Sequence, residues 1–207
     1  MLLVRHGETD WNKLGKFQGQ CDVPLNKRGL GQARQTARAI SDAPFCAVYA
    51  SPLSRTMQTA EEISKPAQRD EIPGVIQMNG LKELDLGDLE GITGSEMRAD
   101  WAQFYAAWRD DPAELVLPGG ESIKQLQDRA WQAVLAIEAA HQDGDSLVAV
   151  SHNFAIRTIV CRLLDIPLSN FHRMALSLAS ICTLELGGSG RRLVAYNSTS
   201  HLSPKYR

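Results

Sequence analysis

Three short clusters of this 207-residue sequence place cationic and imidazole side chains directly after apolar segments. The clusters are RHG at 5–7, SPLSR at 51–55 and SHN at 151–153. Guanidinium groups bind phosphate oxygens in a forked geometry, and a neutral imidazole can attack phosphorus and hold it covalently. No cluster of carboxylates that could bind a cation lies nearby in the sequence. These residue types therefore indicate chemistry on an anion, and phosphate is the anion that fits them best.

The apolar segments before the clusters are short and rich in β-branched residues, which favours strands. The segment LNKRGLGQARQTARAI has helical periodicity with Asn26 as N-cap, and another helix is expected after Pro52. Strands are expected at 2–4, 46–50, 146–150, 182–186 and 193–196. This alternation predicts an α/β fold: a mostly parallel central sheet with helices on both faces, in three layers.

Ligands of such sheets bind outside the carboxyl ends of the strands. We therefore expect Arg5, His6, Arg55 and His152 to converge in one crevice, although the sequence separates them widely.

A single domain over 1–207 is expected, with a helical insertion at about 94–120. Its core is SEMRADWAQFYAAW, read as one amphipathic helix over 95–108. The aromatic stripe of that helix favours packing over a ligand-facing lid. A further long helix is expected from Glu121 to Ala140.

Composition excludes several classes of protein. The net charge of -2 and the pI near 6.2 argue against a nucleic-acid binder. No long apolar segment or leader precedes Arg5, so we expect a cytoplasmic protein with no membrane association.

The scattered cysteines favour reduced, mostly buried thiols over disulfides or a zinc site; these are Cys21, Cys46, Cys161 and Cys182. A homodimer is left open.

Metal-dependent and thiol chemistry find no support in the motifs. The sequence contains no GxxxxGK[ST], no HExxH and no carboxylate pair with histidines at ligand spacing. A cysteine phosphatase loop needs arginine six residues after the cysteine, and those positions hold Lys27, Pro52, Pro167 and Gly188. We therefore expect no metal and no cofactor, and histidine remains as the nucleophile.

The segments LLVRHGETDWN, FQGQCDVPLNKRG, YASPLSRTMQTA, LKELDLGDLEG, PGGES and AVSHN together resemble the histidine phosphatase superfamily, in its phosphoglycerate mutase-like branch. The resemblance implies a phosphohistidine on His6, within a phosphate pocket of Arg5, Arg55 and His152. It also implies that Asn12 and Gln18 bind phosphate oxygens and that Gly19 lets the backbone approach the ligand. Gly7 is expected to allow a sharp backbone turn.

Glu83 matches the general acid of this family. A departing alkoxide needs a proton, and the same carboxylate can later accept one from water. That role needs a raised pKa, hence burial or a neighbouring charge. Asp85 is kept as an alternative acid, whereas Asp88 and Glu90 are interpreted as loop-capping or solvated carboxylates. Surface or structural roles are expected for His141, His172 and His201.

The favoured function is a metal-independent phosphomonoesterase for a small phosphorylated metabolite. A cofactor-dependent phosphoglycerate mutase is the first alternative, but it should offer extra cations, and the insertion offers only Arg98 and Arg109. A non-catalytic module that binds a phosphorylated ligand is the second. Asn153 stands where the family usually has glycine, which puts the substrate preference in doubt. The natural substrate stays open.

Overall fold

The central feature of the computed structural model is a mixed sheet; the described residues are 1–65, 74–188 and 190–207. Its six strands follow the order β3-β2-β4-β1-β5-β6. The strands are β1 (Leu2–Arg5), β2 (Phe45–Ala50), β3 (Ile76–Gln77), β4 (Ser146–Ser151), β5 (Ile181–Glu185) and β6 (Arg192–Ser198). The first four strands in the sheet order are parallel, and β5 runs antiparallel to both β1 and β6.

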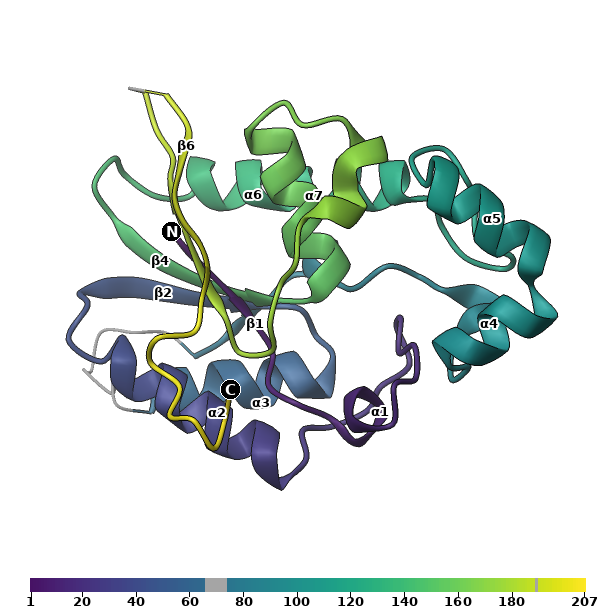
Figure 1. Ribbon diagram of the computed structural model, residues 1–207. Coiled ribbons are helices and arrows are strands. Elements are labelled where there is room, and N and C mark those ends of the chain that lie inside the picture. Colours follow the sequence, from purple (N-terminus) through teal and green to yellow (C-terminus); the bar gives the residue numbers. More distant parts are fainter. Residues whose placement is uncertain (66–73, 189) are drawn as a thin grey trace.

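Helices cover both faces of the sheet (Figure 1). On one face lie α2 (Lys27–Ala39) and α3 (Ser54–Ser64), and on the other lie α6 (Ile123–Ala139) and α7 (Asn153–Leu163). Successive strand residues point to opposite faces. Thus Val4 packs in the core beneath α2 and α3, whereas Leu3 packs in the core beneath α6 and α7. The predicted α/β sandwich with a mostly parallel sheet is confirmed.

Local sequence accounts for where the long helices begin. The Asn26 side chain accepts a hydrogen bond from the Gly29 amide at 2.9 Å, as predicted for the N-cap of α2. Ser122 and Gln125 form a capping box at the start of α6. The short elements α1 (Asp10–Lys13), η1 (Asn79–Leu81), η2 (Gly87–Leu89) and η3 (Leu168–Arg173) were not expected from the sequence.

The segment predicted as one helix over 95–108 forms two helices, so that prediction is wrong. Helix α4 (Gly94–Asp100) ends at Trp101, whose backbone angles of φ -124° and ψ 35° leave the helical region, and α5 (Ala102–Asp110) follows. The pair lies beyond one end of the sheet (Figure 1). Met97 and Trp108 are buried in a third apolar core with Phe171, so the aromatic stripe packs as core.

The cysteines differ in exposure more than the sequence suggested. Cys161 and Cys182 are buried, Cys21 is half-buried and Cys46 is exposed, and all four are free thiols. The prediction of a buried thiol is wrong for Cys46. The pairing of β2 with β4 shifts register between Phe45 and Ala47, and this bulge leaves the side chain between them outside the core.

Within the described ranges, none of the helices is both long and apolar enough to pass through a lipid bilayer.

Candidate active site

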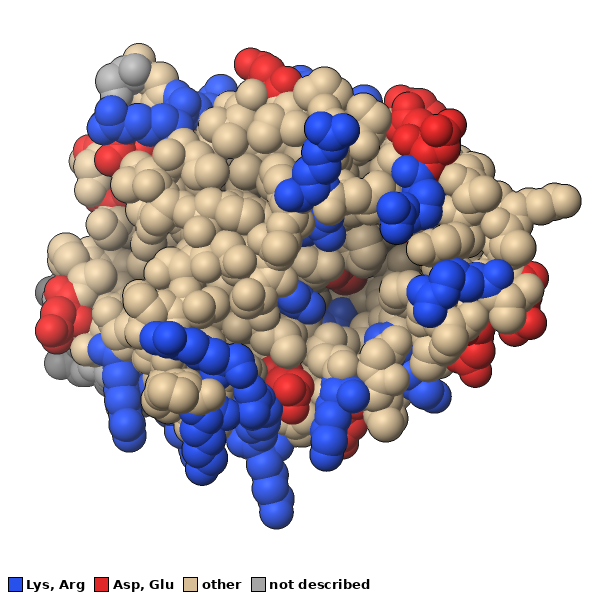
Figure 2. Space-filling view, in the orientation of Figure 1, with Lys and Arg blue, Asp and Glu red and all other residues tan. Residues whose placement is uncertain are grey.

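A pocket of about 140 Å³ opens at the carboxyl ends of β1 and β4. Figure 2 shows a hollow on this face between the main body and the α4–α5 pair, with charged side chains inside it. Eight of the nine predicted site residues line the pocket, and His152 lies behind its wall. The lining consists of Arg5, His6, Asn12, Lys16, Phe17, Gln18, Gly19, Arg55, Glu83, Leu86, Asn153 and Phe154.

Strand register brings the two histidines together. Arg5 and Ser151 are partners in the parallel pair β1 and β4, so His6 and His152 each follow a strand end at the same level. The His6 amide donates to the Ser151 carbonyl at 3.1 Å. The two imidazole rings meet edge to face, with centroids 5.2 Å apart.

The tautomer of His6 is set by the backbone. Its Nδ1 lies 2.7 Å from the Gly7 carbonyl oxygen, which can only accept, so Nδ1 carries the proton. The nitrogen with the lone pair is then Nε2. Burial lowers the pKa of His6 well below its ordinary value, and the charges of Arg55 and Arg5 lower it further. A neutral imidazole with a bare Nε2 is the form that can attack phosphorus.

His152 has a protein partner at each ring nitrogen. Its Nδ1 accepts from Arg55 Nε at 3.3 Å, and its Nε2 lies 2.9 Å from Ser51 Oγ. Because the guanidinium can only donate, the proton of His152 resides on Nε2. Burial and the nearby Arg55 charge lower the pKa of His152 well below its ordinary value. Without a bound anion, His152 is therefore a neutral support for Arg55.

The two arginines are held in different ways. Arg55 is almost fully buried and donates from Nη2 to the Gly19 carbonyl at 2.7 Å and from Nη1 to the Cys21 carbonyl at 2.9 Å. Arg5 donates from Nη1 to the Leu176 carbonyl at 2.6 Å, and its buried Nε has no partner among the described residues. Burial lowers the pKa of Arg5 to about 10, so it stays cationic at neutral pH. A guanidinium that lines the pocket can donate to a phosphate oxygen.

Glu83 lies at the amino end of α7 and is only 6% exposed. Its Oε1 accepts from the amides of Leu84 at 2.9 Å and Ala155 at 3.2 Å, and its Oε2 accepts from the Phe154 amide at 3.1 Å. Burial raises the pKa of Glu83 above its ordinary value, against the opposing effect of these amides and the arginines. This is the environment that a proton donor requires.

Thr9 orients the two amide side chains of the pocket. Its backbone amide donates to Asn12 Oδ1 at 3.1 Å, and its hydroxyl donates to Gln18 Oε1 at 2.8 Å. Because both amide oxygens are engaged inside the protein, the NH₂ groups of these side chains are left for the pocket. An NH₂ group can only donate, which suits phosphate oxygens.

Two glycines allow close packing around the pocket. Gly19 has φ +53°, and a Cβ there would lie 2.1 Å from Glu90 Oε1. Gly7 is not among the residues with positive φ, so the backbone there does not use the left-handed conformation that only glycine adopts readily. Its lack of a side chain serves another purpose: a Cβ at Gly7 would lie 2.5 Å from the carbonyl oxygen of Gly29.

The rival acids have other partners. Asp85 Oδ1 accepts from the Gly87 amide at 3.1 Å, and Glu90 Oε1 accepts from the Gln20 amide at 2.5 Å. None of Asp85, Asp88 and Glu90 lines the pocket. His172 contacts the Trp108 carbonyl, and His201 contacts Thr36, which are structural positions.

Sequence reasoning missed four residues of the pocket: Lys16, Phe17, Leu86 and Phe154. Lys16 is half-exposed and its Nζ lies 5.7 Å from the centroid of the Trp11 ring. Asn153, at the first turn of α7, was expected and does line the pocket. Lys16 lies two positions before the predicted residue Gln18, and this proximity could have indicated a role in the pocket, although no motif includes Lys16.

An imidazole, two guanidinium groups and a buried carboxyl at the strand ends of an α/β sandwich define an enzyme that handles phosphoryl groups. A family model described as histidine phosphatase superfamily (branch 1) matches residues 1–199. The chain belongs to this superfamily, which confirms the resemblance, and it is a hydrolase that acts on phosphate monoesters.

Relatives with assigned activities match nearly the whole chain. The chain is 30% identical over 206 residues to phosphoserine phosphatase 1 of Hydrogenobacter thermophilus, with 100% of this chain and 95% of that protein covered. It is 34% identical over 206 residues to a metal-independent phosphoserine phosphatase of Arabidopsis thaliana, with 98% and 83% covered. The solved structure of a mycobacterial glucosyl-3-phosphoglycerate phosphatase with VO3 has a TM-score of 0.86, 28% identity, and 96% and 98% coverage.

Proposed function

We propose that this protein is a metal-independent phosphomonoesterase that takes a small metabolite carrying a carboxylate near its phosphate, and that His6 holds the phosphoryl group covalently. The observation that carries the proposal is the His6 imidazole, whose Nδ1 proton is bound by the Gly7 carbonyl at 2.7 Å while the ring lines a pocket with Arg5 and Arg55.

In the first step, His6 Nε2 forms a bond to phosphorus as the bond from phosphorus to the alkoxide oxygen breaks. Glu83 gives its proton to that departing oxygen. Arg5 and Arg55 stabilise the charge that spreads over the equatorial oxygens of the phosphoryl group. The Gly7 carbonyl stabilises the positive charge that develops on the ring, through the Nδ1 proton.

In the second step, a water oxygen forms the new bond to phosphorus as the bond to His6 Nε2 breaks. The water proton passes to Glu83, which restores its protonated form, and inorganic phosphate leaves. Each half of the cycle therefore uses the same carboxyl group, first as acid and then as base.

The carboxylate preference is supported by Lys16. Its side chain adds a third positive charge to the pocket lining, beside the two arginines that suit the phosphoryl group. Phosphoserine and glucosyl-3-phosphoglycerate, which appear in the names of the relatives, both carry a carboxylate. Phe17, Leu86 and Phe154 complete an apolar side of the pocket that would contact the carbon skeleton.

The mutase alternative needs a second site for a phosphate dianion. Arg98 and Arg109 are exposed on α4 and α5, and neither lines the pocket. Among the described lining residues, Lys16 is the one cation beyond Arg5 and Arg55, and its single charge balances a carboxylate but only half of a phosphate dianion. The binding-module alternative is disfavoured because both nucleophile and acid are present.

The test uses phosphoserine, 3-phosphoglycerate and p-nitrophenyl phosphate with EDTA present. We expect hydrolysis of all three, an acid-labile phosphoenzyme from wild type, and neither from His6→Ala. Lys16→Gln should raise KM for the two carboxylates but not for the aryl ester, and Arg98→Gln serves as the matched control. Strong inhibition by EDTA would contradict the metal-free mechanism. Isomerisation of 3-phosphoglycerate that depends on a bisphosphate primer would favour the mutase.

A cytoplasmic location also remains a proposal. It is supported by the free state of all four cysteines, which suits a reducing compartment.

A further inference from the structure

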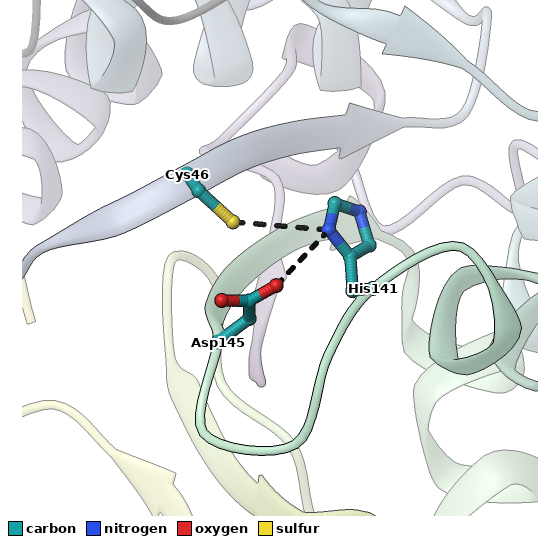
Figure 3. Close-up of side chains that lie close together, drawn as sticks. All are labelled: Cys46, His141 and Asp145. Atoms are coloured by element: carbon teal, nitrogen blue, oxygen red, sulfur yellow. Dashed lines mark hydrogen bonds and ion pairs between the residues drawn. The ribbon is translucent and has the colours of Figure 1, made fainter.

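Cys46, His141 and Asp145 converge near the amino ends of β2 and β4 (Figure 3), whereas the catalytic pocket lies at the carboxyl ends of the strands. Cys46 comes from the start of β2, His141 directly follows the end of α6, and Asp145 precedes β4. Cys46 Sγ lies 3.8 Å from His141 Nδ1, and Asp145 Oδ2 lies 3.7 Å from the same nitrogen. All three candidate ligand atoms lie within 4.8 Å of one another.

The arrangement does not form a proton relay that would activate the thiol. Such a relay uses one ring nitrogen as base toward the nucleophile and the other toward the orienting carboxylate. Here the thiol and the carboxylate face the same nitrogen, Nδ1, while Nε2 lies 2.8 Å from the Tyr49 hydroxyl. Three donors of different types that face one point are arranged as ligands of a cation.

The Tyr49 hydroxyl supplies the outer contact that metal-binding histidines usually have. If Nε2–H donates to the Tyr49 oxygen, the ring presents the lone pair of Nδ1 to the cluster. The Tyr49 and His141 rings also meet edge to face at 5.8 Å, which holds the imidazole in place.

Two of the three distances between ligand atoms come close to those of tetrahedral coordination, and the third lies within 4.8 Å. Zinc bonds of about 2.3 Å to sulfur and about 2.0–2.2 Å to nitrogen and oxygen place ligand atoms about 3.4–3.6 Å apart. The observed 3.8 Å and 3.7 Å need a closure of only a few tenths of an ångström. The exposed Cys46 and Asp145 leave room for water as the fourth ligand.

We propose that Cys46, His141 and Asp145 bind one Zn²⁺ ion, with water as the fourth ligand. Thiolate, imidazole and carboxylate together suit zinc, whereas Mg²⁺ prefers oxygen ligands. On binding, the thiol of Cys46 releases its proton to the buffer as the sulfur–zinc bond forms. The ion would join the start of β2 to the turn between α6 and β4, which the Gln142 amide already supports by donating to Asp145 Oδ2 at 2.9 Å.

The site is remote from the phosphoryl chemistry. Ser51, the partner of His152, directly follows β2 and lies five positions after Cys46, which spans about 16 Å of extended strand. Zinc here should therefore stabilise the fold without changing turnover, and the site is compatible with a metal-independent phosphatase.

The direct test is titration of the purified protein with Co²⁺ and Zn²⁺. We expect one Co²⁺ per chain with a thiolate-to-cobalt charge-transfer band, displaced by Zn²⁺ but not by Mg²⁺. Cys46→Ser should abolish the band, and His141→Ala and Asp145→Asn should weaken binding. Tyr49→Phe should weaken it about 10–100-fold. Cys21→Ser is the matched thiol control, and His6→Ala, which removes the pocket imidazole, should bind like wild type.

Thermal unfolding separates the effect of zinc on stability from any effect of metal on catalysis. Zinc should raise the Tm of wild type and not that of Cys46→Ser, and EDTA should reverse the rise while leaving kcat for p-nitrophenyl phosphate unchanged. Far-UV circular dichroism of each variant verifies that it is folded, and phosphatase activity gives a second check for every variant except His6→Ala. Cobalt binding without a sulfur band, or zinc stabilisation that survives in folded Cys46→Ser, would overturn the proposal. A negative result here leaves the proposed phosphatase activity untouched.

Discussion

Arg55 Nε donates to His152 Nδ1 across 3.3 Å, so a cation of the pocket is held by a neutral imidazole behind it. The Ser51 hydroxyl lies 2.9 Å from Nε2 and fixes the orientation of the ring from its other side. The chain Ser51–His152–Arg55 therefore positions the guanidinium before any anion arrives.

This contact predicts that Arg55 and His152 act as a unit. Arg55→Ala and His152→Ala should each lower kcat about 10²–10³-fold, the usual cost of losing a preorganised donor. The double variant should be little worse than the poorer single variant, because residues in one network are not additive. Steady-state kinetics of the four proteins measure the coupling. Independent, multiplicative losses would show that His152 acts on the substrate without Arg55.

The pH dependence should reflect opposite shifts in two groups. At their ordinary pKa values a glutamate would be ionised before a histidine became neutral. Burial lowers the pKa of His6 and raises the pKa of Glu83, which favours the productive pair of neutral imidazole and protonated carboxyl. Activity should be lost as pH falls through the pKa of His6, below 6.5, and as pH rises through that of Glu83, above 4.5.

Glu83→Gln should remove the basic limb that Glu83 causes and lower kcat about 10²–10⁴-fold for an alkyl phosphate. The loss should be smaller for p-nitrophenyl phosphate, whose leaving group needs little protonation. Because the substrate's own second ionisation is present with both enzymes, profiles of wild type and variant are compared on the same ester. An unchanged basic limb in Glu83→Gln would assign the proton to another group, with Asp85→Asn as the next variant.

Asn153 should influence substrate preference more than chemistry. Its side chain lines the pocket at the first turn of α7, where the wider family usually has glycine. Asn153→Gly should change KM for phosphoserine about 2–10-fold, the value of one hydrogen bond. Its kcat for p-nitrophenyl phosphate should stay within about twofold. A large fall in kcat for both esters would instead place Asn153 in the catalytic step.

Gly7 should be required for stability. A Cβ at this position would lie 2.5 Å from the Gly29 carbonyl oxygen and 2.9 Å from its Cα, which are backbone atoms that cannot move aside cheaply. Gly7→Ala should therefore lower the free energy of unfolding by about 1–3 kcal/mol, measured by denaturant titration. Gly74→Ala, where nothing lies within 4 Å, should change it by less than about 1 kcal/mol. Equal values for the two variants would contradict the packing argument.

The sheet and the location of the pocket were predictable because each of these strands is an apolar segment followed directly by polar site residues. Apolar β-branched segments marked β1, β2 and β4, and the polar residues that follow them had to share an edge once those strands ran parallel. β3 could not be predicted, since two residues carry no periodicity.

The remaining misses depend on contacts between distant segments. The break at Trp101 interrupts an otherwise regular helical pattern, and the bulge beside Cys46 depends on its pairing with β4. The sequence predicted that His152 and Arg55 converge, but only the structure shows that Arg55 and Ser51 engage the two ring nitrogens of His152. Lys16 reached the pocket through the loop after α1, which no motif marks.

Arg5 and Arg55 are the charges that oppose protonation of Glu83. A phosphate dianion in the pocket would share the field of those same cations and so raise the proton affinity of the carboxyl. By thermodynamic linkage, ligand binding and proton uptake then favour each other. Glu83 therefore need not be fully protonated in the free enzyme, because binding of the ester favours uptake of a proton from the solvent. Calorimetric binding of vanadate in buffers of different ionisation enthalpy would register that uptake as a buffer-dependent heat.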